Sequence, residues 1–128
     1  MNVLLDTNAY SAMRRGHPFV LDRVQRAETL CMSSVVVGEI LFGFRAGSRA
    51  QRNISVLEAF LASPGVRFLP VTLTTADRYS RIAVALRRKG TPIPTNDIWI
   101  AALVQQHHLL LYSRDSHFDA LPQLSRLE

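Results

Sequence analysis

The sequence predicts a three-layer α/β/α fold with a short, mainly parallel sheet of about four to five strands. Short apolar runs typical of buried strands alternate along the chain with longer segments of helical periodicity. Strands separated by helical segments of this length indicate a parallel sheet with helices on both faces. In such sheets, functional sites gather at the carboxyl ends of the strands.

Four apolar runs are the expected strands. They cover residues 2–5, the end of a strand at 31–33, residues 66–71 and residues 109–112. The clearest helix is expected over residues 75–88, because apolar side chains recur there at helical spacing and Gly90 follows the last turn. Amphipathic helices are expected over residues 53–62 and 19–26.

Two further helices, residues 35–44 and 98–104, are apolar on nearly every side and are therefore predicted to be buried. Their aromatic side chains, Phe42, Phe44 and Trp99, are interpreted as core residues rather than as platforms for stacking bases.

Length and composition indicate one globular domain spanning residues 1–128, without linker, repeat or low-complexity segment. The single cysteine, Cys31, lies in an apolar segment and is expected to be a buried free thiol. The N-terminus lacks the positively charged region that begins a signal peptide. No apolar run approaches the ~18 residues of a membrane span, so a cytoplasmic protein is expected.

The chain is basic: 15 Lys and Arg against 10 acids give a net charge of +5. This balance favours a polyanionic partner such as nucleic acid. Nearly all the cations are arginine, whose guanidinium group binds phosphate in a bidentate manner.

Four of the acids occupy positions where a surface charge is not expected. Asp6 directly follows the first strand and Asp115 follows the last, so both should project from the carboxyl edge of the sheet. Glu39 and Asp97 belong to the two apolar helices. Glu39 shares its helix face with apolar side chains, and Asp97 lies in a first turn, where the helix dipole favours an anion.

Each acid also has a purely structural interpretation. Asp6 or Asn8 would cap a following helix, and Asp115 would cap the turn at residues 116–118. Asp97 would interact favourably with the dipole of its helix. Glu39 would need a buried cationic partner, and the nearest cation in sequence, Arg45, lies off its helix face.

Convergence of the four acids would either raise their pKa values sharply or demand a counterion, since each like-charge pair about 4 Å apart costs on the order of 4 kcal/mol at an effective dielectric constant near 20. A divalent metal ion is the simpler of the two solutions. A set of oxygen donors without cysteine or histidine at ligand spacing suits Mg²⁺ or Mn²⁺, as one or two ions. Such an ion can activate water and stabilise the displacement at a phosphodiester.

Four segments in this order resemble PIN-domain nucleases across nearly the whole chain: residues 4–8 (LLDTN), 37–43 (VGEILFG), 96–102 (NDIWIAA) and 113–118 (SRDSHF). The compact size resembles the VapC toxins of toxin–antitoxin pairs, which are Mg²⁺-dependent endoribonucleases. This resemblance assigns catalysis and metal binding to Asp6, Glu39, Asp97 and Asp115, and supporting polar roles to Thr7, Asn8 and Ser113.

The resemblance also implies the partners. They are a structured cellular RNA as substrate, a cognate antitoxin that reaches the acids with an arginine, a second toxin subunit in a homodimer, and DNA only indirectly through the antitoxin. Five arginines are candidates for RNA binding because they follow Asp6 or the Glu39 helix: Arg14, Arg15, Arg45, Arg49 and Arg52.

The histidines and the end of the longest helix have simpler interpretations. His107 and His108 are expected to cap a helix, and residues 87–89 to complement a helix dipole. His117 is the one histidine of interest, because it lies near Asp115. A histidine-based ribonuclease mechanism has little support.

Two other functions stay open at the level of sequence. One is a non-catalytic regulator whose acidic cluster docks an arginine of a DNA-binding partner. The other is a PIN-like nuclease that cuts DNA. A phosphoacceptor receiver domain is disfavoured, because the only lysine, Lys89, ends a helix instead of following a late strand.

Overall fold

The computed structural model describes residues 1–127 and has the predicted α/β architecture. Its four strands are β1 (Asn2–Leu5), β2 (Thr29–Ser33), β3 (Val66–Leu69) and β4 (Leu110–Tyr112), in the order β3-β2-β1-β4. All three pairings are parallel, with Val3 of β1 aligned with Leu30 of β2 and Leu110 of β4. The strands' carboxyl ends therefore meet at one edge of the sheet.

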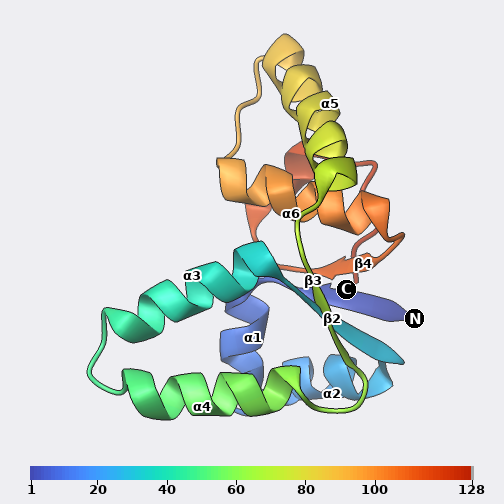
Figure 1. The fold of residues 1–128 in the computed structure, drawn as a ribbon. Coiled ribbons are helices and arrows are strands. Elements are labelled where there is room, and N and C mark those ends of the chain that lie inside the picture. The colour runs from blue at the N-terminus through green and yellow to red at the C-terminus, as the bar shows by residue number, and fades with distance from the viewer. Residues whose placement is uncertain (128) are drawn as a thin grey trace.

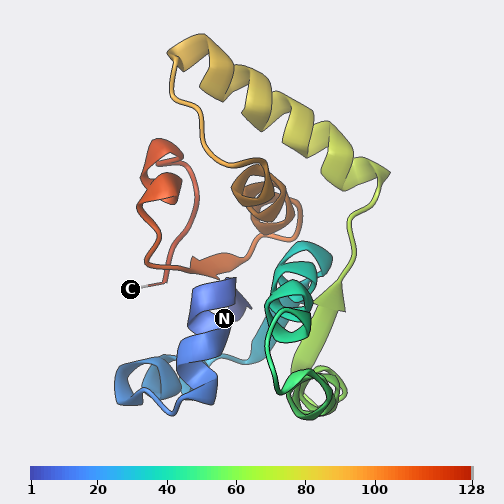
Figure 2. The ribbon, with the colours of Figure 1, turned by 90° about the vertical axis from the view of Figure 1, so that its left-hand side faces the viewer.

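Helices cover both faces of the sheet (Figure 1). One face carries α5 (Leu73–Lys89) and α6 (Thr95–Gln106), and the other carries α1 (Thr7–Arg14), α2 (Pro18–Arg26) and α4 (Ala50–Leu61). Helix α3 (Ser34–Arg45) extends outward from the carboxyl edge, and the short 3₁₀ helix η1 (Ser116–Ala120) follows β4. Viewed toward that edge, α1, α3, α6 and η1 surround one region (Figure 2).

The predicted elements agree with the structure except at some ends. Strand β3 ends at Leu69 instead of residue 71, because Pro70 follows and has no N–H for a sheet hydrogen bond. Helix α5 begins at Leu73, since the Thr75 hydroxyl accepts a hydrogen bond from the Thr72 N–H and closes a capping box.

The core lies between the sheet and its two helical layers. Strands β1 and β2 are almost wholly buried, and the predicted buried thiol of Cys31 is confirmed. Helix α6 is also buried, as predicted, with Ile98 and residues 100–104 in the core. None of the helices formed by residues 1–127 is long and apolar enough to cross a lipid bilayer.

The prediction that residues 35–44 form a buried helix is wrong. Only Val36 and Ile40 of α3 are buried, and Phe42, predicted to be a core residue, is 78% exposed. Phe44 is half-buried, as is Trp99, whose ring stacks on Tyr79 at 4.0 Å between centroids. Helix α3 is exposed because it projects from the sheet edge, where no other element covers its outer side.

Candidate metal centre

Asp6 is fixed at the carboxyl end of β1 by the start of the next helix. It is the N-cap of α1, and its Oδ1 accepts a hydrogen bond of 2.8 Å from the Ala9 N–H. The residue is only 6% exposed. The capping interpretation is therefore correct, and it is compatible with a functional role, because the cap holds the carboxylate in one orientation.

Asp115 reaches the same place from the neighbouring strand, β4. It is the N-cap of η1, where its Oδ1 accepts a hydrogen bond of 2.9 Å from the His117 N–H. The intervening Ser113 is buried, and its Oγ accepts a hydrogen bond of 3.0 Å from the Asp115 N–H. Ser113 also makes a side-chain hydrogen bond to Asp6, so it links the two acids.

Glu39 faces the site from the second turn of α3. Its Oε1 accepts a hydrogen bond of 2.9 Å from the Thr7 hydroxyl of α1. Within residues 1–127, no cation forms an ion pair with Glu39. Glu39 is half-buried instead of buried, so it does not need the buried cationic partner that its structural interpretation assumed.

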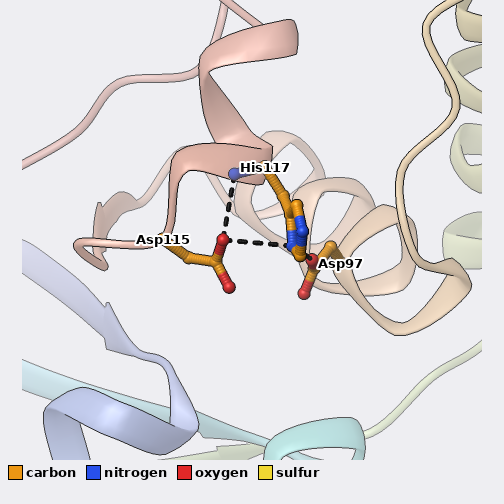
Figure 3. A group of neighbouring side chains, drawn as sticks. All are labelled: Asp97, Asp115 and His117. Atoms are coloured by element: carbon orange, nitrogen blue, oxygen red, sulfur yellow. Dashed lines mark hydrogen bonds and ion pairs between the residues drawn. The ribbon is translucent and has the colours of Figure 1, made fainter.

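Asp97 lies in the first turn of α6 and is mostly buried, with its side chain 15% exposed. Its Oδ2 lies 2.8 Å from Nδ1 of His117, and the same nitrogen lies 3.0 Å from Oδ1 of Asp115 (Figure 3). The structure thus adds a histidine to a set of residues predicted to consist of acids alone.

The charges of Asp115 and Glu39 act on both Asp6 and Asp97. Burial raises the pKa of the Asp6 carboxyl, hydrogen bonds from Ser113 and the Ala9 N–H lower it, and the charges of Asp115 and Glu39 raise it further. Burial likewise raises the pKa of Asp97; the His117 hydrogen bond opposes this, and Asp115 and Glu39 add to it. A divalent cation would relieve this repulsion.

The supporting and basic residues lie around this centre. Asn8 is exposed and lines a cavity of about 180 Å³ together with Ser113, Arg15 and Arg114. A second cavity, of about 420 Å³, lies between α1 and α4 and is lined by four of the five predicted RNA-binding arginines: Arg14, Arg15, Arg49 and Arg52. We call this cavity the arginine groove.

The arginine groove does not include the acids. Helix α1 connects the two regions. Asp6 is its N-cap and Arg14 lies eight residues later, a rise of about 12 Å along the helix axis. Arg45 ends α3 and is exposed, but it does not line the groove.

Comparisons with known proteins agree with this arrangement. A model of the PIN domain family matches residues 3–124. The chain belongs to the PIN domain family. A similar curated protein is "Ribonuclease VapC2" of Haemophilus influenzae, 32% identical over 117 residues, which are 90% of this chain and 87% of that protein.

Solved structures of similar fold cover almost the whole PIN domain. The DNA-bound VapBC of Salmonella typhimurium superimposes with a TM-score of 0.88 at 23% identity, covering 99% of this chain and 97% of that one. VapBC-5 of Mycobacterium tuberculosis, described as a member of a family of toxin–antitoxin systems, has a TM-score of 0.75 at 25% identity and covers 99% and 95%.

The donor set of this PIN domain fits a divalent metal ion. Burial raises the pKa values of Asp6 and Asp97, and the charges of Asp115 and Glu39 raise both further. No ion pair joins Glu39 to a cation among the described residues. Carboxylate oxygens are the ligands that Mg²⁺ and Mn²⁺ prefer. An acidic cluster of this composition is what such an ion requires.

One positioning residue of this PIN domain was not predicted. The Arg126 guanidinium donates hydrogen bonds to the Ser113 and Asp115 carbonyls, at 2.7 and 3.3 Å, and pairs with Asp119 at 2.7 Å. It therefore holds the loop that carries Asp115. No local pattern marks Arg126, because its partners lie 11 and 13 residues earlier in the sequence.

Proposed function

We propose that this PIN domain, acting as one unit over residues 1–128, is a metal-dependent endoribonuclease and the toxin of a toxin–antitoxin pair. The observation that supports the proposal is that Asp6 and Asp97 both lie close enough to Asp115 and Glu39, at the carboxyl edge of the sheet, to be affected by their charges. The ribonuclease named among its relatives supports RNA as the substrate. The net charge of +5 supports a polyanionic ligand.

The four acids are the residues that would hold Mg²⁺ or Mn²⁺, as one or two ions. When bound, the ion supplies positive charge at a phosphodiester oxygen and lowers the pKa of a coordinated water. The protein's contribution is to orient the ligands: the α1 cap and Ser113 fix Asp6, and the Thr7 hydroxyl fixes Glu39. Preorganised ligands of this kind cost little reorganisation during reaction.

The arginine groove would bind the phosphates that flank the cleaved bond. Guanidinium groups pair with phosphates in a bidentate manner, and four of them line this cavity. Because α1 runs from the groove to Asp6, a nucleic acid that follows this helix would lead from the arginines to the acids. A folded RNA, which presents phosphates on more than one strand, suits two separated contact regions.

The partner of the toxin would be an antitoxin that places an arginine among the acids. Uncompensated carboxylates are a natural receptor for a guanidinium group. DNA would be bound only through the antitoxin, in line with the DNA-bound VapBC complex named among the similar structures. Because the proposed substrate is a cellular RNA, we expect the toxin to act in the cytoplasm, and we expect it to act as a homodimer.

The test is end-mapping of total cellular RNA after incubation with the purified protein and Mg²⁺ or Mn²⁺. We expect new ends at specific sites, absent with EDTA and with Asp97→Asn. Ends that persist in the variant would contradict catalysis by the acidic cluster. A total lack of new ends would favour the non-catalytic regulator whose acids dock an arginine, and cleavage of matched DNA but not RNA would favour a DNA nuclease.

A further inference from the structure

His117 lies among the acids of the proposed metal centre although the sequence pattern assigns it no role. Its Nδ1 lies 2.8 Å from Oδ2 of Asp97 and 3.0 Å from Oδ1 of Asp115. The donor atoms of these three residues all lie within 4.8 Å of one another. Figure 3 shows the imidazole edge turned toward both carboxylates.

We propose that His117 is a ligand of the divalent metal through Nδ1, and that it shifts the preference of the site from Mg²⁺ toward Mn²⁺. This inference rests on the proposed function, because it assigns one more donor to the same metal centre. A nitrogen donor strengthens Mn²⁺ relative to Mg²⁺, which is a harder ion and selects oxygen ligands.

The spacing of the donors supports a shared ion. Adjacent ligands of an octahedral ion, each at about 2.1 Å from the metal, lie about 3.0 Å from each other. The two nitrogen–oxygen distances, 2.8 and 3.0 Å, match that separation.

The number of available protons also supports a shared ion. One ring nitrogen carries at most one hydrogen, so Nδ1 can donate a full hydrogen bond to only one of the two carboxylates that face it. The two carboxylate oxygens beside Nδ1 therefore fit better as neighbouring ligands of one metal ion than as two hydrogen-bond acceptors of the same nitrogen.

The backbone holds His117 in this position independently of its ring. The His117 N–H donates to Oδ1 of Asp115 at 2.9 Å, which fixes the first turn of η1. The side chain is 48% exposed, so an ion bound there would keep open positions for water and a phosphate. A substitution of the ring alone should leave the turn in place.

The competing interpretation is an internal ion pair, in which a protonated His117 neutralises Asp97 and Asp115. The two interpretations predict opposite effects of removing the ring. Loss of a ligand weakens metal binding, whereas loss of a competing cation strengthens it. The sign of the change in Mn²⁺ affinity therefore separates them.

The experiment is Mn²⁺ titration of the full chain by electron paramagnetic resonance at pH 8, with spin-echo detection of nitrogen coupled to the bound ion. The variants are His117→Phe, His117→Asn and, as a matched control elsewhere in the chain, His17→Phe. We expect nitrogen coupling in the wild type and in His17→Phe, and its loss in both His117 variants. The Mn²⁺ dissociation constant should rise about tenfold in His117→Phe, within the range for loss of a supporting metal contact.

The Mg²⁺ dissociation constant should change less than that for Mn²⁺, and His117→Asn should bind Mg²⁺ like the wild type, because its amide offers an oxygen. Bound Mn²⁺ without nitrogen coupling, or tighter Mn²⁺ binding by His117→Phe, would overturn the inference while leaving the proposed nuclease intact. No Mn²⁺ binding by the wild type, or binding unaffected by Asp97→Asn, would instead contradict the metal centre itself.

Discussion

Asp6 shows how one side chain combines a structural and a functional role. As the N-cap of α1 it stabilises the helix, and as a buried acid beside Asp115 and Glu39 it is repelled by their charges. Asparagine is an equally good N-cap, because its side-chain oxygen accepts the same hydrogen bond. The two roles can therefore be separated by one substitution.

We predict that Asp6→Asn raises the melting temperature of the metal-free protein at neutral pH. The raised pKa of Asp6 means that the folded state binds its proton more tightly than the unfolded state does. The ionised carboxylate thus destabilises the fold at neutral pH, and this cost disappears as the pH falls toward the ordinary value of 3.8. Each kcal/mol of relieved repulsion raises the melting temperature by about 4 °C in a domain of this size.

The measurement is thermal unfolding in EDTA between pH 7.5 and pH 4, with Asp77→Asn as the control, since Asp77 forms an exposed pair with Arg81. The difference in melting temperature between Asp6→Asn and the wild type should shrink as the pH falls. Without EDTA, the rise in melting temperature on adding Mn²⁺ should be smaller in Asp6→Asn than in the wild type. An Asp6→Asn protein that is less stable than the wild type in EDTA would show that repulsion at this site is unimportant.

Local sequence pattern marks the four acids, and it marks His117 only through its nearness to Asp115; it does not mark Arg126 or the contact between His117 and Asp97. Asp6 directly follows a strand, Asp115 comes three residues after one, and Glu39 and Asp97 interrupt apolar helices, so local pattern marks all four. His117 and Arg126 acquire their roles from contacts with residues 20 and 13 positions away. A pattern within a short window carries no information about such contacts.

At the scale of elements, α3 and α6 show why apolar content did not determine burial. Both helices are apolar on most sides, but α6 packs between the sheet and α5, and α3 projects from the sheet edge. Sequence periodicity indicates which helices can be buried. The arrangement of the layers, which depends on the whole chain, decides which of them are.

The C-terminal segment is a second element whose role depends on tertiary contacts. It runs beside β4, with a hydrogen bond from the Leu111 N–H to the Ser125 carbonyl and one from the Leu127 N–H to the Leu111 carbonyl. Arg126, between these two bonds, reaches the Asp115 loop with its side chain 26% exposed. The segment thus supports the metal centre.

We predict that Arg126→Ala lowers the melting temperature by about 4–8 °C, because charge-assisted hydrogen bonds to partly buried carbonyls contribute about 1–2 kcal/mol. Mn²⁺ affinity should fall as well, since the Asp115 loop loses its support. The matched control is Asp119→Asn, which removes the exposed ion pair alone and should lower the melting temperature by under about 3 °C. Equal effects of the two substitutions would assign the stabilisation to the ion pair instead of the loop.

The arginine groove gives a second prediction at this scale. Arg49→Gln combined with Arg52→Gln should weaken RNA binding most at low salt and reduce the dependence of the binding constant on salt concentration, by about one unit of slope for each lost phosphate contact. The control is Arg87→Gln with Arg88→Gln, at the C-terminal end of α5. An equal change of slope in both pairs would indicate binding by net charge without a defined groove.

At the scale of the whole molecule, parallel topology brings the acids together. Asp6 and Asp115 follow neighbouring strands, β1 and β4, and α3 begins directly after β2, so all three elements meet at one edge. The predicted parallel sheet therefore brings Asp6, Asp115 and the helix that carries Glu39 to one edge. The predicted sheet does not show that the arginine groove lies apart from the acids, because the position of the groove depends on where α4 packs.

The exposed apolar side chains suggest where a second subunit would bind. Phe68, Val71 and Leu73 lie close together in sequence between β3 and the start of α5, and Leu73 is 87% exposed. The Val71 N–H donates to the Ser34 hydroxyl, so this segment lies against the start of α3. Exposed apolar side chains that cluster on one surface, unlike scattered ones, are typical of an interaction site.

We predict that Leu73→Glu shifts the protein from dimer to monomer in sedimentation velocity experiments, because a charge cannot be buried unpaired at an apolar interface. Val84→Glu, which alters another exposed apolar side chain farther along α5, is the control and should leave the dimer in place. Metal binding should survive in both variants, since the acids lie on other elements. If Leu73→Glu stays dimeric and Val84→Glu is monomeric, the interface lies farther along α5 than predicted. A monomeric wild type would contradict self-association altogether.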